Sequence, residues 1–276
     1  MPTRPRPWWQ SRGLPTRYHN GRCSPRCDEA LTLTHSLVVI PARYASSRFP
    51  GKALADLGGK SVLRRCYEQV RQVVDSQHII VATDDNRIVD ECRQHNIRVE
   101  MTGSDCMTGT DRVAEVAQRV HADWYVNVQG DEPFLDPSGL RAVISATHHA
   151  DAGVSVINAY SAITTEDDFR STTVPKLVID SQQRLLYISR AAIPTTKQLS
   201  FHGARRQIGL YAFRPQALQV FSQQRAKTPL EELEDIEILR FVELGVAVQM
   251  IEVNSVGIAI DTPDDLARAR QHLGVS

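Results

Sequence analysis

The pattern of apolar and polar positions changes along the chain at Ser36. From there, short runs rich in Val and Ile alternate with longer amphipathic segments, which is typical of buried parallel strands joined by helices. The apolar runs predict strands at residues 37–40, 78–83, 98–101, 124–129 and 153–159. Apolar residues recur at helical spacing over residues 62–74 and 113–120. We therefore expect the nucleotide-binding half of an α/β fold here.

The chain after residue 173 has a different pattern. Three strands are predicted at residues 174–180, 185–188 and 207–213 without long helices between them, so some antiparallel pairing is expected. An insertion that binds an acceptor or forms a dimer would have this pattern. Helices are predicted at 215–224, 230–243 and 262–273, and a last strand at 247–253.

Residues 1–35 share neither pattern, because Arg and Pro recur there without helical or strand periodicity. We expect either a disordered extension or a start codon assigned too far upstream. One domain is therefore expected over residues 36–276.

Composition narrows the class of partner. Lys and Arg together number 32, as do Asp and Glu, so no net charge favours nucleic acid or a membrane surface, and a small-molecule partner is expected. No apolar run approaches the roughly 20 residues of a membrane helix, and no secretion signal is evident, so we expect a cytoplasmic protein. The five cysteines lack zinc-ligand spacing, and no metal–thiolate site is expected.

The loop after the first predicted strand is rich in cations. It carries Arg43, Arg48 and Lys52 together with the hydroxyls of Ser46 and Ser47. Such a loop, beyond the carboxyl end of a strand, is suited to holding phosphates. The simpler alternative is a basic loop that only contacts solvent.

Two common phosphate motifs are absent. A P-loop is excluded because Gly51-Lys52 is followed by Ala53, and because Leu54 stands where Gly59-Lys60-Ser61 would need its first glycine. The dinucleotide pattern G-x-G-x-x-G does not follow the first strand, which argues against a dehydrogenase.

Acidic residues end two other apolar runs. Asp131 follows the strand at 124–129, and Asp261 follows the run at 256–260. Because Mg²⁺ that bridges phosphates typically takes one or two carboxylates, the pair is a candidate magnesium site. For Asp261, the role of a helix N-cap is equally suitable. Two further segments, Thr83-Asp84 and residues 108–112, either belong to the same edge of the sheet or serve only as turn and cap.

Taken together, these segments resemble the 3-deoxy-manno-octulosonate cytidylyltransferases (CMP-Kdo synthetases) from about residue 37 to residue 273. The motifs that carry the resemblance are residues 40–48, 50–52, 81–84, 109–112, 127–133, 187–194, 209–211, 229–231 and 261–263, with Glu234, Glu237, Leu239 and Arg240.

The resemblance implies a doubly wound, mostly parallel sheet with a smaller dimerising or acceptor-binding subdomain, and a homodimer. It also implies an activity that requires CTP and magnesium. In that reaction, CMP passes from CTP to the anomeric hydroxyl of an acidic 3-deoxy sugar, 3-deoxy-manno-octulosonate, and pyrophosphate is released for lipopolysaccharide or capsule synthesis.

Residue roles follow from the same resemblance. Arg43, Lys52, Asp131 and Asp261 would be catalytic, and the two aspartates would ligate the metal. The nucleotide would contact Pro41, Ala42, Arg43, Ser46, Lys52, Thr83, Asp84, Thr108, Gly109, Thr110 and Arg112. The acceptor would contact Gln129, Arg190, Gln207, Tyr211, Glu234, Glu237 and Ile238.

Two departures from the family pattern lie among the acceptor residues. Gln207 stands in place of a histidine, and Ile238 stands in place of a glutamine, four residues after Glu234 on the same expected helix face. A related sugar acid, such as the 8-amino form, is therefore an alternative acceptor. The alternative that is not an enzyme is a homologue that binds nucleotide without catalysing a reaction.

Overall fold

The computed structural model describes residues 36–46, 48–254, 257 and 259–275, so the extension expected over residues 1–35 lies outside it. In the described part, one sheet has the order β3-β2-β1-β4-β8-β5-β9; β6 pairs with β8, and β7 pairs with β6. Its strands are β1 (Ser36–Pro41), β2 (Ile79–Thr83), β3 (Val99–Met101), β4 (Trp124–Val128), β5 (Val156–Ile163), β6 (Lys176–Ile179), β7 (Leu185–Ser189), β8 (Ala204–Phe213) and β9 (Val248–Glu252).

The strands of the first half run parallel. β1 pairs in parallel with β2 and β4, and β2 pairs in parallel with β3. β8 is antiparallel to both of its neighbours β4 and β5, whereas β9 is parallel to β5. β6 is antiparallel to β7 and β8. The expected antiparallel pairing in the later part of the chain is thus confirmed.

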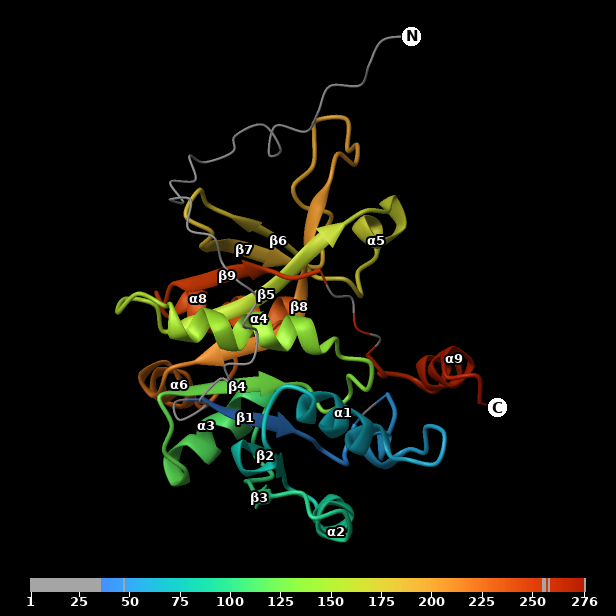
Figure 1. Ribbon diagram of the computed structural model, residues 1–276. Helices are drawn as coiled ribbons and strands as arrows, with labels where there is room; N and C mark the ends of the chain where they lie inside the picture. The colour runs from blue at the N-terminus through green and yellow to red at the C-terminus, as the bar shows by residue number, and fades with distance from the viewer. Residues whose placement is uncertain (1–35, 47, 255–256, 258, 276) are drawn as a thin grey trace, which may run out of the picture.

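Helices cover both faces of the sheet, so the expected doubly wound α/β fold is confirmed (Figure 1). On one face, Val38 shares a buried cluster with Leu63 of α1 and with residues of α4. On the other face, Val39 shares a cluster with Val113 of α3 and with residues of α6 and α8.

Within the described residues, no helix is both long and apolar enough to cross a bilayer. The α-helices are α1 (Val62–Arg71), α2 (Asn86–Gln94), α3 (Gly109–Arg119), α4 (Pro137–His148), α5 (Glu166–Arg170), α6 (Pro215–Ser222), α7 (Pro229–Glu234), α8 (Ile238–Glu243) and α9 (Pro263–His272).

The prediction of a single helix over residues 230–243 is wrong. Asp235, with φ of 50° and ψ of 50°, takes the left-handed conformation and separates α7 from α8. A short acidic side chain tolerates this conformation better than most residues do. The expectation that Ile238 shares a helix face with Glu234 therefore fails, and Ile238 is fully buried in the cluster that contains Val39.

A smaller part of the fold extends from the main sheet. β5 and β8 pair as far as Ile163 and Ala204, beyond the ranges predicted for them, and reach toward β6, β7 and α5 (Figure 1). Ile163 and Ala204 form a separate apolar cluster with Phe169 of α5 and Val174. This part matches the smaller subdomain expected in the second half of the chain.

Candidate active site

A cavity of about 790 Å³ lies at the edge of the sheet where β1 and β4 end. The loop after β1, the start of α3, the loop after β4 and the segment around α7 bound it. Ligands of open α/β sheets bind beyond the carboxyl ends of the strands. The cavity is lined by these residues from the sequence analysis: Pro41, Ala42, Arg43, Ser46, Lys52, Thr108, Gly109, Arg112, Gln129, Asp131, Arg190, Gln207, Tyr211, Glu237 and Asp261.

Lys52 joins the two aspartates of the candidate metal site. Its Nζ lies 2.5 Å from Oδ2 of Asp131 and 2.8 Å from Oδ1 of Asp261. Burial opposes the charge of this ammonium, but the two carboxylates outweigh that effect and raise the pKa of Lys52. Gly51, at φ of 75°, precedes the short 3₁₀ turn Lys52–Leu54 and turns the chain into it. The two acids that the sequence placed on one edge therefore meet around a single cation.

Gly130 allows the Asp131 loop to lie against the end of β1. Its N–H donates to the carbonyl oxygen of Pro41 at 3.3 Å, and a Cβ on Gly130 would lie only 2.8 Å from that oxygen. The carbonyl of Asp131 in turn accepts from the N–H of Ile260 at 2.9 Å. These backbone contacts bring the loop after β4 beside the segment that carries Asp261.

Asp261 is not the N-cap of α9, which answers the question left open by the sequence. Thr262 caps this helix in a capping box with Asp265. The carboxylate of Asp261 faces the cavity instead, where it also pairs with Arg48 at 3.2 Å. Asp261 thus remains available as a ligand for a cation.

The start of α3 borders the cavity. Thr108 is its N-cap and forms a capping box with Asp111, whose Oδ2 accepts from the Thr108 N–H at 2.8 Å. Thr110 does not line the cavity, because it is buried and its N–H donates to Glu237 at 3.1 Å. Thr108 and Gly109 therefore form the turn that lines the cavity, and Thr110 anchors it.

Arg112 is held in place by Asp84. The guanidinium lies 2.9 Å from Oδ2 of Asp84, and it also donates to Thr102 Oγ1 at 2.7 Å. Asp84 and the buried Thr83 do not line the cavity. The structure therefore does not place Thr83 and Asp84 in contact with a ligand there, and Asp84 reaches the site through Arg112.

Arg43 is exposed on the cavity wall, and no side chain in the described part of the chain forms an ion pair with it. Its charge is therefore available to an anionic ligand, and Arg48 and Lys52 contribute further positive charge nearby. This loop has the charge and position expected of a phosphate-binding loop.

Glu237 connects two other parts of the cavity wall. Its Oε1 accepts from Nε2 of Gln129 at 3.4 Å, and its Oε2 accepts from the Thr110 N–H. Burial raises the pKa of Glu237, although hydrogen bonds from Thr110 and Thr108 act to lower it. Tyr211 is also buried here, and burial followed by the charge of Glu237 raises the pKa of its phenol.

Arg190 lines the cavity, whereas Glu234 supports it from behind. The guanidinium of Arg190 donates to the carbonyl oxygens of Thr172, Glu234 and Asp235. Oε2 of Glu234 accepts from the Arg190 N–H at 2.9 Å, and its Oε1 accepts from Ser189 at 2.5 Å. The structure therefore places Glu234 as a support for Arg190 rather than on the cavity wall.

Gln207 lines the cavity, and Asn158 orients its side chain. Nε2 of Gln207 donates to Oδ1 of Asn158 at 3.0 Å. Ile238, in contrast, is buried in the core and does not line the cavity, so the structure does not support its predicted contact with the acceptor.

Glu132 is a lining residue that the sequence analysis missed. Burial first, and then the charges of Asp131 and Asp261, raise its pKa to about 8. Its side chain packs beside Gly209, where an added Cβ would lie 2.5 Å from Glu132 Oε1. In the sequence, the position of Glu132 directly after Asp131 was the one feature that could have identified it as a lining residue.

Lys227 and Asp235 also line the cavity and form an ion pair at 2.8 Å. No motif in the sequence indicated them, because the pair depends on the left-handed turn after α7.

The chain is similar to known proteins of one family. The family profile described as "Cytidylyltransferase" matches residues 37–250. The 3-deoxy-manno-octulosonate cytidylyltransferase of Geobacter metallireducens is 41% identical over 246 residues, covering 85% of this chain and 96% of that protein. The enzyme of the same name from Syntrophotalea carbinolica is 40% identical over 244 residues, covering 85% and 97%.

A solved structure of CMP:2-keto-3-deoxy-manno-octonic acid synthetase, complexed with CTP, is 33% identical with a TM-score of 0.79. It covers 87% of this chain and 98% of its own. On the profile match and the identity with full-length relatives, the chain belongs to the 3-deoxy-manno-octulosonate cytidylyltransferase family.

Proposed function

We propose that this protein transfers CMP from CTP to the anomeric hydroxyl of 3-deoxy-manno-octulosonate and releases pyrophosphate. The observation that carries the proposal is the meeting of Lys52, Asp131 and Asp261 at the mouth of a cavity that Arg43 also lines. The names and lengths of the relatives support the same reaction.

Charge control is the main chemical task at this site. When the sugar oxygen bonds to the α-phosphorus of CTP, the bond to the pyrophosphate oxygen breaks and negative charge grows on the leaving group. Lys52, Arg43 and Arg48 line the cavity and are suited to stabilise that charge. The turn at Thr108 and Gly109 would hold the nucleotide beside them.

We further propose that Asp131 and Asp261 hold Mg²⁺. These residues fit a hard cation, because both carboxylates already converge on one positively charged atom, Nζ of Lys52. When bound, the ion would polarise the α-phosphate and lower the pKa of the attacking hydroxyl. Lys52 would then contact phosphate rather than both acids.

The acceptor is proposed to lie between Gln129, Arg190, Gln207 and Tyr211, which line one side of the cavity. Because Asn158 orients Gln207, this amide has a defined direction in which to recognise a hydroxyl or an amine. A related acidic sugar, including the 8-amino form, remains the alternative that Gln207 motivates.

A homodimer in the cytoplasm is proposed as the working form, and its product would supply lipopolysaccharide or capsule synthesis. Leu186 of β7 and Leu233 of α7 are 58% and 79% exposed, so these two elements have apolar side chains available for a second copy. Light scattering of the purified protein would test the dimer, and a monomer at micromolar concentration would contradict it.

The reaction is tested by following pyrophosphate release from CTP with Mg²⁺ and a panel of acidic sugars. The proposal predicts turnover with 3-deoxy-manno-octulosonate in preference to its analogues. A preference for the 8-amino form would support the alternative acceptor. Tight CTP binding without turnover on any acceptor would instead indicate a homologue without catalysis.

A further inference from the structure

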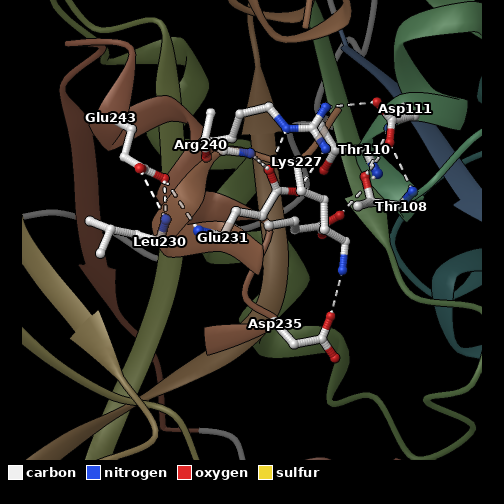
Figure 2. A network of polar contacts seen from close by, with 11 residues as sticks. Thr108, Thr110, Asp111, Lys227, Leu230, Glu231, Asp235, Arg240 and Glu243 are labelled. Carbon is white, nitrogen blue, oxygen red and sulfur yellow. Dashed lines mark hydrogen bonds and ion pairs between the residues drawn. The ribbon is translucent and has the colours of Figure 1, made fainter. Parts of the chain in front are cut away.

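Arg240 of α8 is completely buried and joins two acids from distant segments (Figure 2). Its Nε and Nη2 each donate to the Glu231 carboxylate at 2.6 Å, which makes a bidentate pair. Its Nη1 donates to Oδ1 of Asp111 at 3.0 Å. The guanidinium also lies over the ring of Phe221, with its carbon 3.8 Å from the ring centroid.

Both acids belong to the first turns of helices that border the cavity. Asp111 closes the capping box of α3 with Thr108. Glu231 of α7 accepts from the N–H of Thr228, the residue before that helix, at 3.1 Å. Thr108 and Glu231 are themselves lining residues. One cation therefore fixes the start of α3 relative to the start of α7.

A second connection runs in parallel with the first. Glu237, which directly precedes α8, accepts from the Thr110 N–H and from the side chain of Gln129. The first turn of α3 is thus held at Asp111 by Arg240 and at Thr110 by Glu237. The segment around α7 and α8 forms the acceptor side of the cavity, so its position and that of the nucleotide side depend on each other.

We propose that Arg240 is a positioning residue for both substrates, an inference that rests on the proposed cytidylyltransferase reaction. Arg240 itself does not line the cavity. It holds the turn at Thr108 and Gly109 on the nucleotide side against α7 on the acceptor side. A buried ion triad adds little stability, because desolvation offsets much of the attraction. The planar guanidinium of an arginine does fix distances and angles between its partners, which a lysine cannot reproduce.

Asp111→Asn is the sharpest variant for testing this role. The amide oxygen of asparagine can keep accepting the hydrogen bonds of the Thr108 cap, while the amide group that replaces Oδ1 cannot accept from Arg240. The cap of α3 is kept and the link to α8 is lost. Arg240→Lys provides the complementary change, since it keeps the charge but loses the bidentate geometry.

Asp180→Asn is the matched control. Asp180 also accepts backbone N–H groups with one oxygen, from Gln182 and Arg184 at 2.8 Å, and pairs with an arginine, Arg184, through the other. It lies in the turn between β6 and β7 and does not line the cavity. This pair is more exposed than the pair of Arg240 with Asp111, so the control reports effects of the aspartate-to-asparagine change that depend neither on burial nor on the cavity.

Steady-state kinetics of the full-length protein, with both substrates varied at a temperature well below each variant's melting point, separate the outcomes. We expect Arg240→Lys to reduce kcat/KM on the order of 10- to 100-fold, because small displacements of positioned groups have large effects. Asp111→Asn should raise the KM for CTP several-fold in the native background and cause no further loss in the Arg240→Lys background.

Folded variants with native KM and kcat would overturn the proposal, as would additive losses in the double variant or equal losses in Asp180→Asn. If Arg240→Lys fails to fold, the KM for CTP of Asp111→Asn, compared with that of Asp180→Asn, still tests the positioning role. Turnover by the native protein tests the proposed reaction separately, so failure of one idea is distinguishable from failure of the other.

Discussion

The ammonium of Lys52 lies 2.5 Å from a carboxylate oxygen of Asp131, although 79 positions separate the two residues in sequence. The same ammonium lies 2.8 Å from Asp261, a further 130 positions along the chain. Three segments thus converge where the sheet ends, and one lysine neutralises part of the charge of two acids. If a triphosphate bound together with a metal ion, Lys52 would have to turn to the phosphate while the two aspartates turned to the metal.

Removing that cation should disable catalysis. We expect Lys52→Met to lower kcat/KM for CTP on the order of 100-fold or more, because the leaving pyrophosphate loses a charge that stabilises it. Initial rates of pyrophosphate release would measure the effect. Lys60→Met is the control, since Lys60 forms a 2.6 Å ion pair with Glu68 and does not line the cavity. Near-native kcat/KM in Lys52→Met would contradict the proposed role.

Replacing Asp131 should change the requirement for magnesium. Asp131→Asn removes one of the two charged ligands that we propose for Mg²⁺, so we expect the Mg²⁺ concentration for half-maximal rate to rise at least 10-fold and kcat to fall. A magnesium titration at saturating CTP checks this. Asp136→Asn serves as the control, because Asp136 only caps α4 and asparagine is an equally good cap. If both variants respond alike to magnesium, Asp131 is not a ligand.

The sheet was predictable from the sequence because buried parallel strands are continuously apolar, and the runs around Val38, Ile80 and Val126 have that pattern. The meeting of Asp131 and Asp261 was predictable for a related reason. Each acid follows an apolar run in the sequence, and the carboxyl ends of parallel strands share one edge of a sheet. Asp131 does follow β4, whereas residues 257, 259 and 260 before Asp261 are not part of a strand. Asp261 reaches the same edge because the Ile260 N–H donates to the Asp131 carbonyl oxygen.

The side of the cavity near α7 and α8 was less predictable. The break at Asp235 depends on one residue in the left-handed conformation, which carries no periodic signal, and it moves Ile238 from the expected helix face into the core. Thr83, Asp84 and Glu234 have the right chemistry for a site, but their partners within the fold are visible only in three dimensions. Polar residues near the cavity were therefore predictable, but which of them line it and which support it from behind was not.

Cys106 should react slowly although it lines the cavity. Burial first, and then the neighbouring Glu115, raise the pKa of its thiol to about 12. A thiol with that pKa is protonated at pH 8 except for roughly one molecule in ten thousand, and only the thiolate is nucleophilic. We expect alkylation of Cys106, followed by peptide mass spectrometry, to accelerate about tenfold per pH unit from pH 8 to 10. Glu115→Gln should accelerate it at fixed pH; fast alkylation of the native protein at pH 7 would refute the expectation.

Glu234 should contribute stability that depends on pH. Burial opposes its ionisation, but hydrogen bonds from the Arg190 N–H, Ser189 and Tyr187 outweigh burial and lower its pKa. A lowered folded-state pKa means that the contribution is present above the unfolded pKa of about 4.3 and is lost as pH falls through the folded pKa. Glu234→Gln should therefore be less stable than the native protein by on the order of 1 kcal/mol at pH 7. Urea unfolding should show this difference shrinking below about pH 4; a constant difference from pH 7 to 3 would count against this account.

Gly130 should not tolerate a side chain, because it is the point where the Asp131 loop meets the end of β1. A Cβ there would lie 2.8 Å from the Pro41 carbonyl oxygen, and backbone cannot move aside as a flexible side chain can. We expect Gly130→Ala to cost about 1–3 kcal/mol of unfolding free energy and to lower kcat by displacing Asp131 from Lys52. Gly153→Ala is the matched control, since no atom lies within 4 Å of its added Cβ and its φ is not positive. Thermal unfolding and pyrophosphate release measured on both variants decide the matter: equal, small effects would mean that the Asp131 loop can shift, and that its close contact with Pro41 is not what positions the acid.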